Sequence, residues 1–223
     1  MMRRFLVAID GPAGAGKSTV ARLVAEQLGL TYVDTGAMYR GVAWRALQEK
    51  VDVTNEEVLA QLAEATQFKL EKEGIRINGK WLKEELRTPE VSQLASAIAK
   101  MGEVRQALVR KQQEIARQHG VVMDGRDIGT HVLPHADVKV FLTASIEKRA
   151  KRRYLELLAK GYQVDERTLQ EEIRKRDEND QTRKHSPLRQ AEDAVFIDTS
   201  DLTVSEVVEK ILELCRTKVG GNE

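Results

Sequence analysis

Nine consecutive residues near the N-terminus have the composition of a phosphate-binding loop. They fit the pattern G-x-x-x-x-G-K-S and read Gly11, Pro12, Ala13, Gly14, Ala15, Gly16, Lys17, Ser18, Thr19. Such small residues let backbone N–H groups surround an anion, and Lys17 can reach the terminal phosphates of a nucleotide. Ser18 would offer its hydroxyl to Mg²⁺. A glycine-rich turn without a ligand is the alternative, but the full pattern favours binding of a nucleoside triphosphate.

The segments on either side of the loop predict a strand and a helix. The apolar run 5–9 is typical of a buried strand, and apolar residues recur at helical spacing over 20–28, up to the helix-stopping Gly29. A second strand over 30–33 leads to Asp34, Thr35 and Arg40. Because ligands bind at the carboxyl ends of parallel strands, we expect these residues on the same rim as the loop. Arg40 is a candidate for a second phosphate, or else an ordinary solvated arginine.

A further apolar run, 121–123, ends in Asp124 and predicts another buried parallel strand. An aspartate in that position can hold Mg²⁺ through water, or it can cap the following turn. Arg126 and Asp127 follow at once and add charge to the same edge. Further strands are expected over 138–143 and 194–198.

Residues 148–185 predict a strongly charged pair of helices interrupted at Gly161. The second helix begins near Asp165, and Arg176, Asp180 and Arg183 fall on one face at i, i+4 and i+7. Acidic residues four positions before basic ones also fit a solvated, salt-bridged helix. Beside a phosphate loop, the pair can instead serve as a lid that supplies arginines to transferring phosphates.

The segment between about residues 58 and 97 departs from the α/β pattern. Short alternating pieces flank the strong turn signal at Asn78 and Gly79, which predicts a small β-rich excursion. A helix with proline in its first turn follows at 88–90, and another is expected over 101–118. Capping boxes are expected at 54–57 and 203–206.

Composition narrows the function classes. The 223 residues suit one α/β domain with insertions, and a net charge of +1 gives no reason to expect nucleic acid or an anionic membrane as partner. Cys215 is the only cysteine, which excludes an internal disulfide and fits a reducing cytoplasm. No stretch of the sequence approaches a membrane span, the histidines lack metal-ligand spacing, and no G-x-S-x-G elbow supports a hydrolase triad.

Five motifs in this order resemble those of the bacterial cytidylate kinases, a group of nucleoside monophosphate kinases with a phosphate-binding loop. Four of them lie at 11–19, 34–40, 86–91 and 124–130, and the fifth runs from Arg176-Asp177 to Arg183. The match runs almost end to end. The first motif occurs in many enzymes, whereas the others are far more specific. Thr35 stands where some relatives have serine, and Ser18 where relatives can have glycine; the hydroxyl is kept or added in both cases.

The resemblance implies a fold and a domain plan. The fold would be a three-layer α/β P-loop kinase fold with a central parallel sheet, a small β-containing monophosphate-binding insert and a short helical lid. The core would comprise 1–57, 98–147 and 186–223, with the insert at about 58–97 and the lid at about 148–185. We expect a single cytoplasmic domain acting as a monomer.

The resemblance also implies transfer of the ATP γ-phosphoryl group to CMP or dCMP with Mg²⁺. Residues 11–19 would bind ATP, with Ser18 on the metal directly and Asp124 through water. The implied CMP-binding residues are Thr35, Tyr39, Arg40, Ser96, Arg105, Arg126, Asp127, Arg176, Asp180. The implied catalytic residues are Lys17, Arg126, Arg176, Arg183.

The chemistry of these residues agrees with that expectation. Cytosine presents an amino donor beside two acceptors, so Asp127 with donors at Ser96 and Arg105 would match its edge, whereas uracil reverses two of those positions. A phosphate acceptor is already ionised near neutral pH, so no general base is needed. Two other functions stay open: a kinase for AMP, UMP or a hydroxylated metabolite such as shikimate, and a nucleotide-dependent switch or nucleic-acid-binding protein. For a guanine-nucleotide switch, the sequence lacks the N-K-x-D motif that reads guanine.

Overall fold

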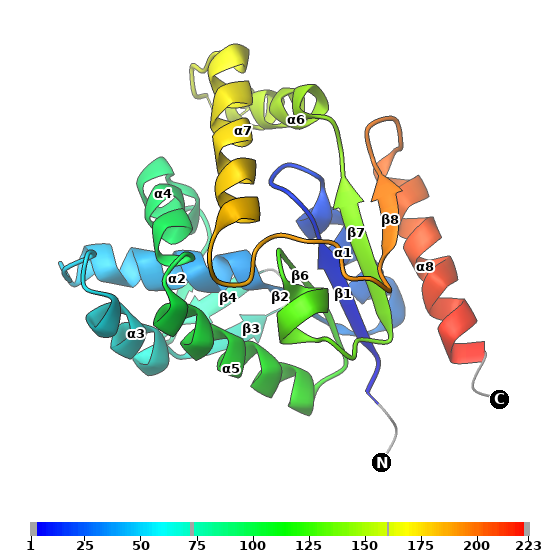
Figure 1. Cartoon of the computed structure of the whole chain (residues 1–223), viewed down its shortest axis with the longest axis horizontal. Coiled ribbons are helices and arrows are strands. Elements are labelled where there is room, and N and C mark those ends of the chain that lie inside the picture. The colour runs from blue at the N-terminus through cyan, green and yellow to red at the C-terminus, as the bar shows by residue number, and fades with distance from the viewer. Residues whose placement is uncertain (1–3, 72–73, 160, 221–223) are drawn as a thin grey trace. The chain divides into compact units, whose positions relative to one another are not determined.

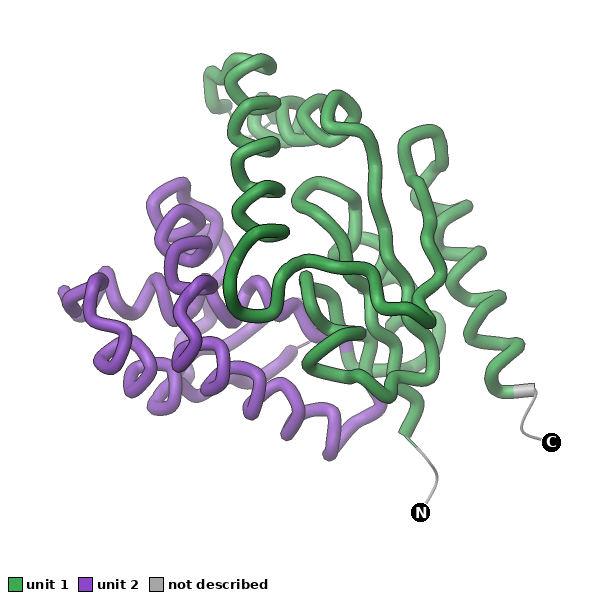
Figure 2. The backbone as a smooth tube through the Cα atoms, in the orientation of Figure 1, with its two compact units in different colours: residues 1–31, 121–223 green, residues 32–120 purple. Residues whose placement is uncertain are grey.

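The computed structural model describes residues 4–71, 74–159 and 161–220 (Figure 1). The chain divides into two compact units, residues 1–31 with 121–223 (unit 1) and residues 32–120 (unit 2), which Figure 2 colours separately. The larger of two sheets has the strand order β2-β6-β1-β7-β8, and the chain passes from unit 1 into unit 2 along β2 (Thr31–Asp34). The smaller sheet has the order β3-β4-β5.

Unit 1 contains strands β1, β6, β7 and β8 with the helices that follow them. The bounds are β1 (Leu6–Asp10), α1 (Lys17–Leu28), β6 (Val121–Gly125), η2 (Ile128–Val132), β7 (Val138–Thr143), α6 (Ile146–Ala159), α7 (Glu166–Thr182), β8 (Val195–Asp198) and α8 (Val204–Gly220). Strand β1 pairs in parallel with both β6 and β7, and β8 pairs in parallel with β7. Every residue of β6 is buried, as a central parallel strand requires.

The register of this sheet brings its functional candidates to one edge. Ile9 pairs with Asp124, and Asp10 pairs with Gly125, so β1 and β6 end together. Gly29 ends α1 in the left-handed region with φ 65°, as the sequence predicts. Helix α8 packs against α1, and its Cys215 is a buried apolar contact of that layer. The loop and the strand-end carboxylates therefore belong to one rigidly built edge.

Helices α6 and α7 form the charged helical pair that the sequence predicts, and they pack against each other (Figure 1). Their shared core consists of Ala150, Leu169 and Ile173, with partly buried apolar neighbours around it. The Asp165 side chain caps α7 by accepting from the Thr168 N–H. Arg183 lies one residue beyond the end of α7, so the predicted helical face continues only through Asp180.

Unit 2 contains the β-rich excursion and the helices on either side of it. The bounds are α2 (Thr35–Gln48), α3 (Glu56–Ala65), β3 (Phe68–Glu71), β4 (Gly74–Ile77), β5 (Lys80–Leu82), η1 (Glu85–Arg87), α4 (Pro89–Ile98) and α5 (Gly102–Gln118). The three strands are antiparallel, and Asn78 and Gly79 turn the chain with φ 50° and 80°. Within this unit α2 packs on α4, and α3 packs on α5.

One local prediction is wrong and a similar one is confirmed. Helix α3 is capped by Asn55, which accepts from the Val58 N–H, and not by Thr54. The Thr54 hydroxyl donates to Asp52 at 2.6 Å instead, because Asp52 forms a tight turn with the Thr54 backbone. The capping box of Thr203 and Glu206 forms as predicted, with hydrogen bonds in both directions.

Candidate functional site

The phosphate loop takes a path that only glycine can follow at two positions. Gly11 has φ 144°, and a Cβ there would overlap the carbonyl oxygen of Leu142 in β7. Gly14 has φ 78°, and its Cβ would lie 3.1 Å from the Cβ of Arg149. The loop therefore lies directly against β7 and α6, and this close approach requires glycine at both positions.

Lys17 is the first residue of α1 and is 5% exposed. Gly16 precedes it in the left-handed region without a side-chain cap, which leaves backbone N–H groups of the first turn available to an anion. The Lys17 Nζ donates to the Pro12 carbonyl at 2.7 Å. Burial and the nearby Arg126 charge lower the pKa of Lys17 to about 7, although Asp124 acts in the opposite direction.

Ser18 and Asp124 form a pair of oxygen donors beside the loop. The Ser18 hydroxyl donates to Asp124 Oδ2 at 2.9 Å. Asp124 is 4% exposed at the end of β6, which lies beside β1. Magnesium prefers oxygen ligands and commonly takes one or two from the protein with the rest from phosphate and water, so the pair fits this ion.

Asp10 is a buried carboxylate that positions the backbone beside the candidate site, and the sequence patterns did not single it out. Its Oδ1 accepts from the Ile128 N–H at 2.8 Å, and its Oδ2 accepts from the Gly129 N–H at 2.7 Å. Burial raises the pKa of Asp10 to about 6, although both backbone hydrogen bonds act to lower it. The carboxylate thereby fixes the backbone immediately after Asp127. Its position at the end of the strand before the loop was the available signal.

Four charged side chains from distant parts of unit 1 form one network. Arg126 Nε donates to Asp180 Oδ2 at 2.8 Å. Arg183 Nη1 lies 3.8 Å from Asp180 Oδ1, and Arg183 Nη2 lies 3.5 Å from Asp127 Oδ1. Burial disfavours the charge of Arg126, but Asp180 and other carboxylates outweigh it and raise its pKa. Burial likewise acts against the Asp180 charge, yet Arg126 and its neighbours lower its pKa. Arg126 and Asp180 therefore both carry their charges in the folded protein.

The remaining charged residues of α6 and α7 have varied surroundings. Arg176 is exposed on α7, and its charge acts on both Lys17 and Asp180. On α6, Lys148 pairs with Asp201, and Arg152 donates to Thr199 through both its Nη atoms. These partners lie far away in the sequence, so much of the basic stretch stabilises tertiary structure.

Unit 2 holds the other predicted site residues. Thr35, Tyr39 and Arg40 all lie on α2, and Asp34 caps that helix while pairing with Arg40 at 3.0 Å. The guanidinium of Arg105, on α5, lies 5.7 Å from the Tyr39 ring centroid. Ser96 is half-buried on α4, which packs against α2.

Two arginines of unit 2 differ in the hydrogen bonds that their guanidinium groups make. Arg105 is 4% exposed and donates to the Ala99 carbonyl at 3.0 Å. Arg40 Nε is buried and has no hydrogen-bond partner among the described residues. A buried N–H group without a partner is costly, so this atom indicates a place for an absent acceptor.

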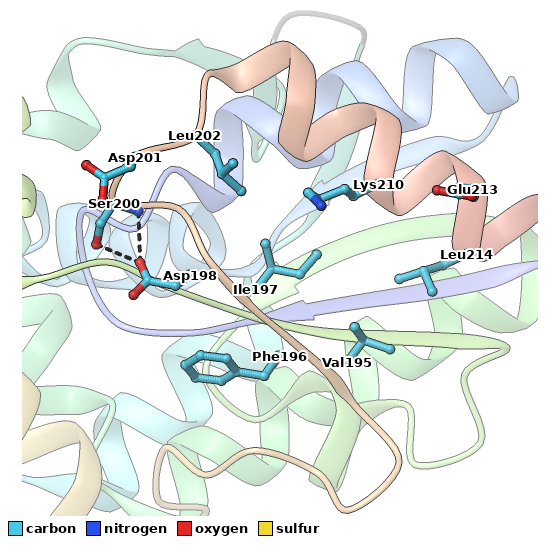
Figure 3. Close-up of a pocket in the computed structure, with 10 residues that line it drawn as sticks. All are labelled: Val195, Phe196, Ile197, Asp198, Ser200, Asp201, Leu202, Lys210, Glu213 and Leu214. Atoms are coloured by element: carbon cyan, nitrogen blue, oxygen red, sulfur yellow. Dashed lines mark hydrogen bonds between the residues drawn. The ribbon is translucent and has the colours of Figure 1, made fainter.

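A surface hollow of about 580 Å³ lies between β8 and α8 (Figure 3). Its ten lining residues include none of the predicted site residues. In this hollow Asp198 Oδ1 accepts from both the backbone N–H and the hydroxyl of Ser200, so this carboxylate oxygen already has local hydrogen-bond partners. Among the described residues, no three His, Cys, Asp or Glu side chains group as a metal site, and no helix is long and apolar enough to cross a membrane.

Known proteins resemble this chain over nearly its whole length. A family model described as "Cytidylate kinase" matches residues 7–217. The cytidylate kinase of Bacillus subtilis is 53% identical over 222 residues, covering 98% of this chain and 99% of that protein. The cytidylate kinase of Caldicellulosiruptor bescii is 50% identical over 217 residues, covering 96% of each chain. Shikimate kinase from Acinetobacter baumannii has the same fold, with a TM-score of 0.50 at 17% identity over 96% of this chain and 94% of that one.

The lowered pKa of Lys17 predicts proton uptake when ATP binds. At pH 8 a lysine with a pKa of about 7 is mostly neutral, and a polyphosphate beside it favours the charged form. Isothermal titration calorimetry in buffers of different ionisation enthalpy should report uptake of about one proton per site at pH 8 and much less at pH 6. Lys17→Arg, which is always charged, should bind without this uptake. Equal proton exchange at both pH values would contradict the prediction.

Proposed function

Because the chain belongs to the cytidylate kinase family, we propose that it transfers the γ-phosphoryl group of ATP to CMP or dCMP, releasing ADP and CDP or dCDP. The observation that carries this proposal is identity of about half the residues to cytidylate kinases over nearly the whole chain. The phosphate loop and the arginines supply the charge that two phosphorylated substrates require.

The donor half of the proposed site is built by unit 1. Residues 11–19 surround the phosphates of ATP with backbone N–H groups, and Lys17 contacts the terminal phosphates. Ser18 and Asp124 would hold Mg²⁺, the first directly and the second through water. When bound, the ion neutralises charge on the phosphate oxygens. A substitution that removes the positive charge of Lys17 should weaken the binding of ATP and leave the binding of the acceptor unchanged.

The residues proposed for the acceptor half are those for which the family resemblance implies CMP binding. The buried Arg40 Nε–H is free to donate to a phosphate oxygen of CMP, and Thr35 lies five residues before it on α2. Ser96, Arg105 and Asp127 match the donor and acceptor pattern of the cytosine edge. Asp180 accepts from ribose hydroxyls, while Tyr39 holds Arg105 in its direction.

The chemistry proposed for the site is alignment and charge neutralisation. The attacking oxygen belongs to a phosphate that is ionised near neutral pH, so no side chain has to remove a proton. Arg126 keeps its charge because carboxylates surround it, and with Arg176 and Arg183 it stabilises the negative charge on the transferring group. This mechanism explains a site rich in arginine and without a histidine.

We further propose the following division of the chain. Residues from about 58 to 97 form the monophosphate-binding insert, residues from about 148 to 185 form the lid, and the rest is the core. The small antiparallel sheet and the packed pair α6–α7 support these assignments. We also propose that the enzyme acts in the cytoplasm as a monomer, for which light scattering should report a mass of 25.1 kDa.

A panel of acceptors tests the proposed activity. ADP release is measured with CMP, dCMP, UMP, AMP and shikimate, because the fold is shared with a shikimate kinase and does not itself decide the acceptor. We expect turnover with CMP or dCMP, and a value of kcat/KM for UMP that is lower by roughly ten- to a few hundred-fold. Preference for AMP or shikimate, or no turnover with any acceptor, would refute the proposal.

Asp127 is predicted to select the base. Asp127→Asn keeps the size of the side chain but offers an amide N–H that can donate to uracil, so KM for CMP should rise about 10- to 100-fold while KM for ATP stays nearly constant. The ratio of CMP to UMP activity should fall as well. Asp52→Asn, at an exposed aspartate whose carboxylate accepts from Thr54, is the control. Equal changes for both substrates would argue against a base contact.

A further inference from the structure

Arg149 makes three directed contacts within unit 1 that the proposed chemistry does not use. From α6, its Nε donates to the Ala144 carbonyl at 2.8 Å and its Nη1 donates to the Ala13 carbonyl at 3.1 Å. Its Nη2 lies 2.7 Å from Asp177 Oδ2 on α7. The side chain is 5% exposed, so solvent screens these contacts little.

The contact with Ala13 fixes the geometry of the phosphate loop. A peptide group is planar and trans, so holding the Ala13 carbonyl toward Arg149 directs the N–H of Gly14 to the opposite side. Gly14 also packs against the Cβ of Arg149, which leaves the loop no room to shift toward α6. The direction of a loop N–H group is what determines its strength as an anion donor.

The contact with Asp177 joins this arrangement to α7. Asp177 Oδ1 is buried and has no hydrogen-bond partner among the described residues, whereas Asp177 Oδ2 forms the ion pair with Arg149. Asp177 directly follows Arg176, one of the arginines assigned to the transferring phosphate. The position of α7 is thereby linked to the phosphate loop through a single guanidinium.

We propose that Arg149 is a positioning residue that orients the phosphate loop for ATP and couples the loop to α7 through Asp177. The inference rests on the proposed function only in taking ATP as the nucleotide. A guanidinium is required because three donors must point in fixed directions at once, and an ammonium group cannot replace them. A purely structural brace between α6 and α7 is the competing explanation.

The test compares Arg149→Lys with a matched pair on the same two helices. Arg149→Lys keeps the charge and loses the fork, so calorimetry without any acceptor should show a Kd for ATP raised about tenfold. In steady state the KM for ATP should rise similarly, while the KM for CMP changes less than about twofold. Lys151 and Glu166 form an exposed ion pair between α6 and α7 at 3.5 Å, and Lys151→Met should leave both constants unchanged.

A double-variant cycle tests the coupling to α7. Asp177→Asn should also raise the Kd for ATP. In the double variant with Arg149→Lys, the fold-increase in Kd should be smaller than the product of the two single fold-increases. The inference is overturned by an unchanged affinity for ATP, or by equal losses for ATP and CMP together with a lowered melting temperature. Failure of the wild-type enzyme to phosphorylate CMP would refute the proposed function, whereas ATP binding by the variants still decides the role of Arg149.

Discussion

Neutralisation of crowded positive charge is the constraint on which unit 1 depends. Arg126, Arg149 and Arg183 have little exposure, and each lies against a carboxylate: Asp180, Asp177 and Asp127 respectively. Lys17 differs, because its Nζ bonds to a neutral carbonyl and its pKa is lowered to about 7. Unpaired buried charge is costly, and a carboxylate within unit 1 compensates each of these arginines.

Two aspartates at the ends of neighbouring strands show how environment separates roles. Asp10 accepts from two backbone N–H groups and holds the segment after β6, whereas Asp124 accepts from the Ser18 hydroxyl beside the phosphate loop. Both are 4% exposed, and the parallel register places them at one edge of the sheet. Position in the sheet makes them neighbours, and their hydrogen-bond partners decide which one is structural.

Local patterns predicted most of the secondary structure and the loop. The glycines at 11 and 14, the stop at Gly29 and the turn at Asn78 are encoded by a few adjacent residues, and the structure confirms them. The cap of α3 was predicted wrongly because Asp52 competes for Thr54, a choice between two local hydrogen bonds of similar strength.

Partners that are distant in sequence could not be predicted in the same way. The basic stretch of α6 fits a solvated helix or a lid equally well, and its contacts with Ala13, Thr199 and Asp201 depend on tertiary packing. The dual bonding of Asp10 to residues 128 and 129 likewise exists only once β1 and β6 pair. Sequence motifs thus propose the residues of a site, but they do not predict the contacts that hold these residues in place.

The choice of lysine at position 17 and arginine at position 149 follows from what each contact demands. Arginine stays charged at any physiological pH and directs its donors rigidly, which suits a brace between Ala13 and Asp177. Lysine is a point charge on a flexible stem. Burial lowers the pKa of Lys17 into the pH range in which a phosphate beside it would favour uptake of a proton from solvent. The loop therefore contacts an arginine whose charge is constant, whereas the charge of Lys17 would respond to a phosphate bound beside it.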